Sequence, residues 1–193
     1  MAQANDQSYN DLVLKARGLF WEKGYQETNI SDLADRLDIS SSLIYRKYSK
    51  DMLFIDSLNS YIASFSDPAL EELRNSKEGL ETFRGFFNGL IDALLTKTFP
   101  RSCFMINTVV ELHNKQDRLD LTEVYNSYFG NMRSTFVIIL KRAVELDEVQ
   151  KVDKIEKYAD FLSGIIPGLS VLYKIKNKEE LQQYINQQLA LIV

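Results

Sequence analysis

Apolar residues recur at helical spacing along most of the chain, and this pattern predicts a series of helices joined by short polar turns. In the first segment, Leu12, Ala16, Leu19 and Phe20 share one face, and Gly24 follows as a natural stop. The expected helices cover residues 11–23, 30–37, 41–48, 50–65, 77–95, 101–113, 119–146, 155–174 and 178–193.

Capping residues mark several of the expected helix starts. Asn29 precedes an apolar run and has Asp32 at the third helical position, which is a variant of the capping box. Ser40 and Ser49 stand before the third and fourth helices in the same way. Pro68 is tolerated only in the first turn of a helix, so the chain is expected to break or kink there.

The predicted fold is all-α, with a small N-terminal module and a larger helical body. Gly and Pro are scarce, at 8 and 3 residues, and no repeat or low-complexity linker interrupts the pattern. The module is expected at residues 1–48. The body is expected at residues 49–193, and the helix that begins at residue 49 links the two.

Composition narrows the classes of function. The net charge of −4 and the pI of about 5.2 argue against general nucleic-acid binding, so any such activity needs a local basic patch. A single cysteine suits a reducing compartment, and the N-terminus has no signal-peptide pattern. The longest uncharged apolar run, residues 161–173, is too short to span a bilayer. A soluble, cytoplasmic protein is expected.

A local basic patch does occur, in the segment that spans the second to the fourth helix. Arg46, Lys47 and Lys50 stand close together, with no carboxylate between Asp38 and Asp51. Two short helices joined by a tight turn form a helix-turn-helix, whose second helix enters the DNA major groove. The alternative is a helical hairpin whose basic side is only solvated. The residues expected to bind DNA are Thr28, Asn29, Ser40, Ser41, Ser42, Leu43, Tyr45, Arg46, Lys47, Tyr48 and Lys50.

Residues 9–55 resemble the DNA-binding domain of TetR-family repressors. The resemblance is carried by Phe20, Gly24, Tyr25 and Thr28; by Ile30, Asp32, Leu33 and Ala34; by Ile39, Ser40, Ile44, Tyr45 and Tyr48; and by Ser49, Lys50, Asp51 and Leu53. The chain departs from the family pattern where Asp38 replaces the usual turn glycine, where Ser42 replaces a frequent glycine, and where the segment from Tyr48 to Lys50 is one residue short. Asp tolerates left-handed backbone, so the turn is expected to survive at modest cost.

The resemblance implies a ligand-responsive repressor that binds a palindromic operator as a homodimer and is released by a small molecule. The body would pair through its last two helices. The helix at 155–174 is apolar almost all round, so it is either a partner surface or simply a buried core helix. Gly164 and Gly168 would let another helix approach closely, and Pro167 predicts a kink. The residues expected at the dimer interface are Ile165, Leu169, Leu181, Tyr184, Ile185 and Leu189.

The body would also hold the effector, expected to be a small apolar or aromatic molecule. The segment "RSCFMINTVVEL" resembles the "G-C-x-x-x-N-x-x-x-E" segment of one C-terminal subgroup of the family, without its glycine. Some members of that subgroup use the cysteine as a sensor of electrophiles or oxidants. Cys103 is therefore either a sensor thiol or a small buried hydrophobe. The expected pocket residues are Phe65, Phe86, Phe104, Asn107, Glu111 and Tyr128, with His113 as another polar candidate.

Enzyme chemistry finds little support. His113 is the only histidine, so no multi-histidine metal site exists, and there is no phosphate-binding glycine pattern. No cofactor or metal is expected. A helical adaptor without DNA binding remains the alternative from another class, and salt-sensitive binding to DNA would separate the two.

Overall fold

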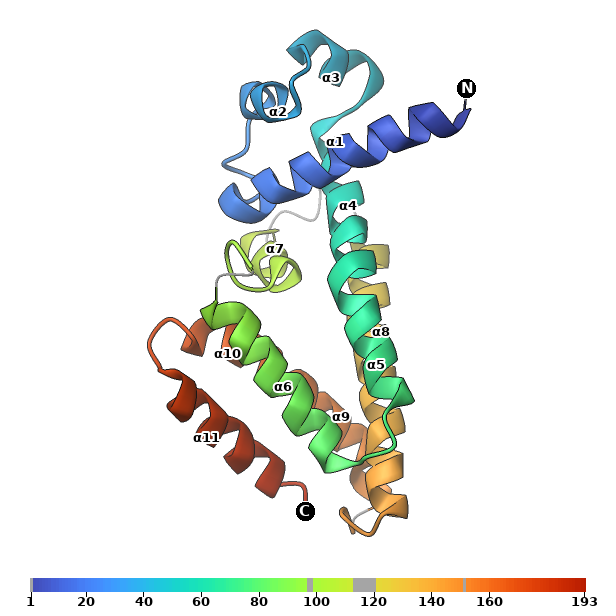
Figure 1. The fold of residues 1–193 in the computed structure, drawn as a ribbon, viewed down its shortest axis with the longest axis vertical. Coiled ribbons are helices and arrows are strands. Elements are labelled where there is room, and N and C mark those ends of the chain that lie inside the picture. The colour runs from blue at the N-terminus through green and yellow to red at the C-terminus, as the bar shows by residue number, and fades with distance from the viewer. Residues whose placement is uncertain (1, 97–98, 113–120, 151) are drawn as a thin grey trace. The chain divides into compact units, whose positions relative to one another are not determined.

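The computed structural model describes residues 2–96, 99–112, 121–150 and 152–193, and it confirms the all-α fold class. These residues form helices and no β-strand beyond a single bridge between Pro100 and Ser102. The helices of Figure 1 are α1 (Ala2–Lys23), α2 (Ile30–Leu37), α3 (Ser41–Lys47), α4 (Lys50–Tyr61), α5 (Asp67–Asn75), α6 (Leu80–Leu95), α7 (Phe104–Leu112), α8 (Thr122–Glu145), α9 (Ile155–Ser163), α10 (Ile165–Leu172) and α11 (Lys178–Ala190). A π-helical turn, Ile62–Ser66, follows α4, and a 3₁₀ turn, Val152–Lys154, precedes α9.

Two boundaries differ from the sequence expectation in an informative way. Helix α1 begins at Ala2 rather than at residue 11, although its first turns carry no apolar stripe. The helix expected at 155–174 is split at Gly164 into α9 and α10. Pro167 has no N–H to bond the carbonyl four residues earlier, which explains an interruption one turn before it.

The chain divides into two compact units, and each is described by itself. Unit 1 comprises Met1–Phe65 and Cys103–Val124, and unit 2 comprises Ser66–Ser102 and Tyr125–Val193. The unit that contains the helix-turn-helix therefore also contains α4 and α7. The expected domain boundary at residues 48 and 49 stays a prediction.

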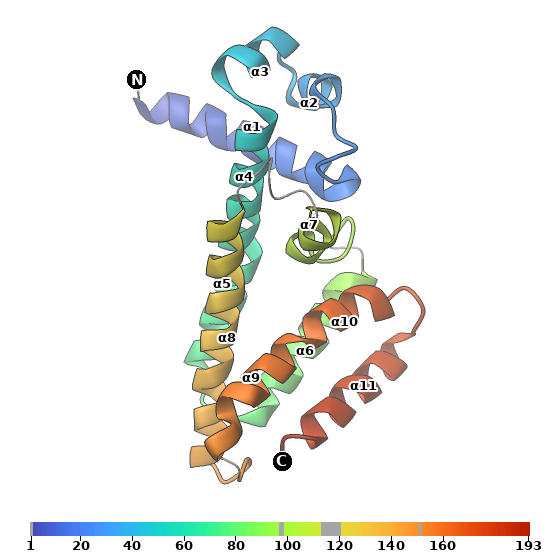
Figure 2. The same ribbon diagram turned by 180° about the vertical axis from the view of Figure 1, so that it is seen from behind.

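Unit 1 is built around α1, which packs against both α2 and α4. Figures 1 and 2 show α2 and α3 on one side of α1 and α7 on the other. An aromatic cluster fills the space between the helices: Trp21 stacks on Phe104, and Phe54 meets both Phe20 and Phe104 edge-on. These contacts tie α1, α4 and α7 into one core.

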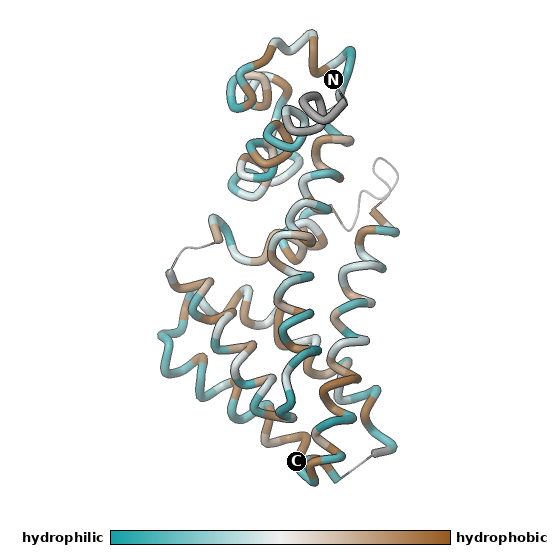
Figure 3. The backbone as a smooth tube through the Cα atoms, turned by 45° about the vertical axis from the view of Figure 1, so that its right-hand side comes forward, coloured by the Kyte–Doolittle hydropathy of each residue, from teal (hydrophilic) through white to brown (hydrophobic). Residues whose placement is uncertain are grey.

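Unit 2 has its own core, made by α6, α8 and the three C-terminal helices. Phe83 and Phe87 of α6 pack edge-on against Phe136 of α8. Helix α11 runs beside α6 (Figure 2), and its apolar face is buried. In Figure 3, hydrophobic and hydrophilic positions alternate along the helices, as expected for helices with one buried face. Over the described ranges, no helix is both long and apolar enough to cross a bilayer.

The turn between α2 and α3 uses a left-handed residue. Asp38 has φ 55° and ψ 47°, and its N–H donates to the carbonyl of Ala34, which closes α2. The expectation that Asp38 replaces the family glycine in a left-handed conformation is thus confirmed. Glycine adopts this conformation without the steric cost that a Cβ brings.

We predict that Asp38→Gly leaves the free energy of unfolding unchanged or raises it by up to about 1 kcal/mol, whereas Asp38→Val lowers it by about 1 kcal/mol or more. A β-branched side chain is the least compatible with positive φ. Chemical denaturation of the three proteins measures the difference. Equal stability of the glycine and valine variants would show that the left-handed turn carries no cost.

Candidate DNA-binding surface

The start of α2 is fixed by the capping box that the sequence predicted. The side chain of Asn29 accepts the N–H of Asp32 at 2.8 Å, and a carboxylate oxygen of Asp32 accepts the N–H of Asn29 at 3.0 Å. Lys23, at the end of α1, pairs with the same carboxylate at 2.9 Å. The hydrogen bond from Asn29 and the pairing with Lys23 lower the pKa of Asp32. The carboxylate therefore joins the end of α1 to the first turn of α2.

Helix α3 is short, and caps hold it at both ends. Ser40 Oγ accepts the N–H of Leu43 at 3.3 Å, as the sequence predicted. At the other end, the N–H of Tyr48 donates to the carbonyl of Ile44 at 3.0 Å. Ile44 itself is fully buried and anchors α3 to the rest of unit 1.

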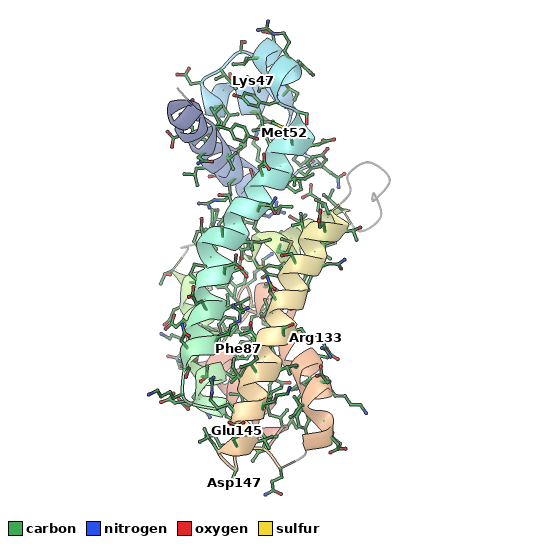
Figure 4. The ribbon with its side chains drawn as sticks, turned by 90° about the vertical axis from the view of Figure 1, so that its right-hand side faces the viewer. Lys47, Met52, Phe87, Arg133, Glu145 and Asp147 are labelled. Carbon is green, nitrogen blue, oxygen red and sulfur yellow. The ribbon has the colours of Figure 1, made fainter. Side chains whose placement is uncertain are left out.

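The opposite side of α3 faces solvent. Ser41, Ser42, Tyr45, Arg46 and Lys47 are all exposed, and Tyr45 keeps 72% of its surface accessible. Figure 4 shows Lys47 on α3. We call these five residues the α3 outer face. It combines small residues, which allow close approach, with hydrogen-bonding and cationic side chains that suit bases and phosphates.

Lys50 follows α3 in the chain and lies in the first turn of α4. Ser49 caps the helix by accepting the N–H of Met52 at 3.0 Å, as predicted. The Lys50 ammonium stands 4.2 Å from the centre of the Tyr25 ring. Burial lowers the pKa of Lys50, while the carboxylates of Asp51 and Glu111 act in the opposite direction. Lys50 is therefore held in place rather than free to sample solvent.

Tyr48 is supported by a residue that sequence reasoning missed. Tyr9 of α1 stacks on Tyr48 with ring centroids 5.3 Å apart, and its hydroxyl donates to Asp56 of α4. Burial, and then the contact with Asp56, raise the pKa of Tyr9. The only signal for this role was that residues 2–10 lack Gly and Pro, which permits the helix to extend.

Thr28 requires a correction. It is completely buried, and its hydroxyl donates to the carbonyl of Gly24 at 2.6 Å. A buried and hydrogen-bonded side chain cannot contact DNA, so Thr28 stabilises the α1–α2 loop instead. The other predicted contacts are exposed or half-buried, including Asn29, Ser40 and Leu43.

The expected pocket residues are divided between the two units. Phe65, Phe104, Asn107 and Glu111 belong to unit 1, and Phe86 and Tyr128 belong to unit 2. Phe104 and Tyr128 are buried. The carboxylate of Glu111 accepts hydrogen bonds from the backbone of the α1–α2 loop. Whether the six residues line one pocket stays a prediction, and His113 lies outside the described residues.

The expected dimer residues lie mostly inside unit 2. The buried ones are Ile165, Leu169, Leu181, Ile185 and Leu189. Tyr184 is half-buried, and its hydroxyl lies 3.4 Å from where a Cβ on Gly168 would stand. The helix that approaches Gly168 closely is therefore α11 of the same chain. These five buried residues form the core of unit 2, so they offer a partner little surface, which corrects their assignment.

Neither the environment of Cys103 nor the arrangement of the described acidic side chains favours thiol sensing or metal binding. Cys103 is 2% exposed, and its sulfur lies 3.4 Å from the hydroxyl of Tyr61. This placement fits the small buried hydrophobe better than an accessible sensor thiol. Within the described residues, no three His, Cys, Asp or Glu side chains gather as a metal site would require.

Comparison with known families accounts for both parts of the chain. Residues 12–55 match the family described as "Bacterial regulatory proteins, tetR family". Residues 79–189 match "Tetracyclin repressor-like, C-terminal domain". The first range contains the caps, the turn and the α3 outer face described above.

Individual proteins agree with this match. The HTH-type transcriptional repressor ComR of Escherichia coli is 26% identical over 159 residues, which cover 81% of this chain and 75% of ComR. A structure of a cysteine mutant of the TetR-family regulator CifR with a 26-base-pair operator has a TM-score of 0.79 at 19% identity, and the alignment covers 93% of this chain and 94% of CifR. The regulator FadR from Bacillus subtilis, in complex with stearoyl-CoA, has a TM-score of 0.69 at 17% identity over 96% of this chain and 97% of FadR.

The similar structures share the fold, and the C-terminal family match alone covers more than half of the 193 residues. The chain therefore belongs to the TetR family of bacterial regulatory proteins.

Proposed function

We propose that the α3 outer face and Lys50 carry the operator contacts of this chain. As a member of its family, the chain is a ligand-responsive, DNA-binding transcriptional repressor, and it acts where the operator lies, in the cytoplasm. The observation that carries the proposal is the exposure of Tyr45, Arg46 and Lys47 on one side of a helix that is anchored from the other side by Ile44. A regulator needs no catalytic group, and we infer no enzymatic activity.

The proposed partner of this surface is a DNA duplex, and different residues are suited to its bases and to its phosphates. Tyr45 and Arg46 project from the exposed side of α3, where side chains can reach base edges. Lys50 sits at the start of a capped helix, where free N–H groups and the positive end of the helix dipole favour a phosphate. The structure of the CifR mutant in complex with operator DNA shows that another protein of this fold binds an operator.

Lys47→Ala tests the operator surface. An operator is first selected from a library of random duplexes, and we expect two inverted half-sites with centres about 34 Å apart or a longer multiple of the helical repeat. If Lys47 contacts a base, the variant should lose about 1–3 kcal/mol of binding free energy. If Lys47 contacts a phosphate, the salt slope, which is the slope of log affinity against log salt concentration, should fall in magnitude by about one unit. Titrations at several salt concentrations measure both quantities.

Lys157→Ala is the matched control, because Lys157 is an exposed lysine of α9. It should bind the operator as the unchanged protein does. If Lys47→Ala matches this control in both affinity and salt slope, Lys47 is not an operator contact. If no duplex is enriched in the selection, the repressor assignment itself fails and an adaptor without DNA binding is favoured.

We also propose that the homodimer of this chain forms on the exposed apolar side of α9 and α10. Phe161, Val171 and Ile175 are exposed, the last two by 62% and 76%. With the exposed Gly164, and with Ile175 just after the end of α10, they recur at intervals of three, seven and four residues, as positions on one helical face do. An exposed apolar stripe of this kind is typical of a surface that a partner covers. The buried residues first expected at the interface would instead support this stripe from beneath.

Val171→Glu tests the dimer surface without disturbing the core. It should raise the dissociation constant of the dimer at least tenfold, because an unpaired charge would be buried against the partner. Leu146→Glu, the same change to Glu at another exposed apolar residue, serves as the control. Sedimentation equilibrium measures both variants. A dimer as tight in Val171→Glu as in the control would place the interface elsewhere.

The effector is proposed to be a small molecule with an apolar or aromatic part, held in the helical body. The aromatic side chains Phe83, Phe86, Phe87 and Phe136 pack together in unit 2 and provide an apolar environment. On α6, Asn88 Oδ1 is buried without a hydrogen-bond donor among the described residues, so it could accept one from a ligand. The complex of FadR with stearoyl-CoA shows that another protein of this fold binds a molecule with a long apolar acyl chain.

We further propose that the body belongs to the subgroup with the "G-C-x-x-x-N-x-x-x-E" segment. In support, Cys103, Asn107 and Glu111 are spaced by four residues, and the N–H of Asn107 donates to the carbonyl of Cys103 at 3.0 Å. Repression that depends on Cys103 oxidation is not favoured, because the thiol is buried.

Release by an effector requires reciprocal coupling. A co-purified molecule, identified by mass spectrometry, should bind about 5- to 150-fold more weakly when the operator is present, and it should weaken operator binding by the same factor. A scrambled duplex of equal length is the control and should leave effector affinity unchanged. Equal dissociation constants with operator and with scrambled duplex would refute induction by that molecule.

A further inference from the structure

Glu111, near the C-terminal end of α7, makes hydrogen bonds to the loop that joins α1 to α2. One carboxylate oxygen of Glu111 accepts the N–H of Tyr25 at 3.1 Å, and the other accepts the N–H of Gln26 at 2.6 Å. The side-chain amide of Gln26 returns a hydrogen bond to the backbone carbonyl of Glu111 at 3.0 Å. Three hydrogen bonds therefore join segments that lie 85 to 86 residues apart in the chain.

The loop is shaped to receive this carboxylate. Gly24 has φ +88°, and a Cβ added there would lie 2.6 Å from an oxygen of Glu111. The N–H of Gly24 makes the last helical bond of α1, to Phe20. The N–H groups of the next two residues, Tyr25 and Gln26, both donate to the carboxylate of Glu111, so they form a small anion-binding nest. Glycine adopts this left-handed backbone without the steric cost of a Cβ, and the missing Cβ leaves room for the carboxylate of Glu111.

Tyr25 extends the contact to the start of α4. Its hydroxyl donates to the carboxylate of Asp51, and its ring lies beneath the ammonium of Lys50 at 4.2 Å. The ring also packs on Phe54 at a centroid distance of 4.8 Å. Tyr25 is thus held through its backbone by α7 and through its side chain by the first turn of α4.

We propose that Glu111 is a positioning residue for operator binding, which acts through Tyr25 on Lys50 and the first turn of α4. The inference rests on the proposed function, because Lys50 is taken there as a phosphate contact. Glu111 touches no DNA in this account. It fixes the α1–α2 loop, and any movement of α7 that withdraws its carboxylate would release Tyr25 and loosen the placement of Lys50.

The charge of Glu111 and its positioning role predict opposite effects on DNA affinity when the carboxylate is removed. If Glu111 acted only as a negative charge near the DNA, its removal would raise affinity for a polyanion. If it positions Lys50, its removal lowers affinity and removes one phosphate contact from the salt dependence. The sign of the change therefore separates the two roles.

Glu111→Gln is the decisive variant, because it keeps the size of the side chain and replaces one acceptor oxygen with a donor. We expect about a tenfold loss of operator affinity and a salt slope lower by about one unit. Glu27→Gln is the matched control: Glu27 is exposed in the same loop, and the charge change is identical. The control should bind as the unchanged protein or more tightly. Binding of Glu111→Gln at or above the level of the control would overturn the proposal.

Tyr25→Phe provides a second, milder variant that keeps the ring and loses the bond to Asp51. If Glu111 acts through Tyr25, the two changes should be non-additive in operator affinity, and additive effects would contradict the route. Should Glu111→Gln fail to fold, Tyr25→Phe alone must lower the affinity, and an unchanged value would then overturn the proposal.

A measurement without DNA separates this inference from the proposed function. Amide hydrogen exchange of Met52 and Leu53, in the first turn of α4, should be about tenfold faster in Glu111→Gln and unchanged in Glu27→Gln. Unaltered exchange would refute the link from α7 to α4 even if the protein represses. If exchange is faster in Glu111→Gln but the protein binds no duplex, the link from α7 to α4 is supported and the role of Glu111 in operator binding is rejected.

Discussion

Everything that the α3 outer face can do depends on holding a helix of seven residues in one conformation. A helix this short is not stable in water on its own, because the cost of nucleation exceeds what a few hydrogen bonds return. Here the cap of Ser40, the turn at Asp38 and the burial of Ile44 supply the missing stability from outside the helix. Because one side is fixed so firmly, the other side can stay exposed to solvent, where we propose that it contacts DNA.

The local arrangement of charged side chains explains how a chain with a net negative charge can bind a polyanion. The net charge of −4 repels DNA on average, but the segment from α3 to the first turn of α4 holds three cations with no carboxylate before Asp51. Three carboxylates of unit 1 close to this segment make hydrogen bonds within the unit: Asp32 in the capping box, Asp51 with Tyr25, and Glu111 with the α1–α2 loop. Local geometry therefore decides the sign of the field that the duplex meets.

The two units show how packing redistributes the roles of similar residues. The apolar segment at 155–174 could have been a partner surface or a core helix. The structure buries one side of it in unit 2 and leaves the other side exposed, and we propose that a partner covers the exposed side. Its break at Gly164 and the burial of Ile165 and Leu169 place one side in the core of unit 2, while Val171 remains exposed. Helical periodicity identifies an apolar stripe, but only the neighbouring helices decide which stripe is covered within the chain.

The sequence by itself determined the fold class, the caps at Asn29, Ser40 and Ser49 and the turn at Asp38, because these depend on neighbours within a few residues. It could not determine the start of α1, where polar residues carry no periodic signal. The burial of Thr28 and the hydrogen bonds between Glu111 and the α1–α2 loop were decided only by the tertiary structure. Both depend on groups brought together by folding, and a contact across some 85 residues leaves no pattern in a single sequence.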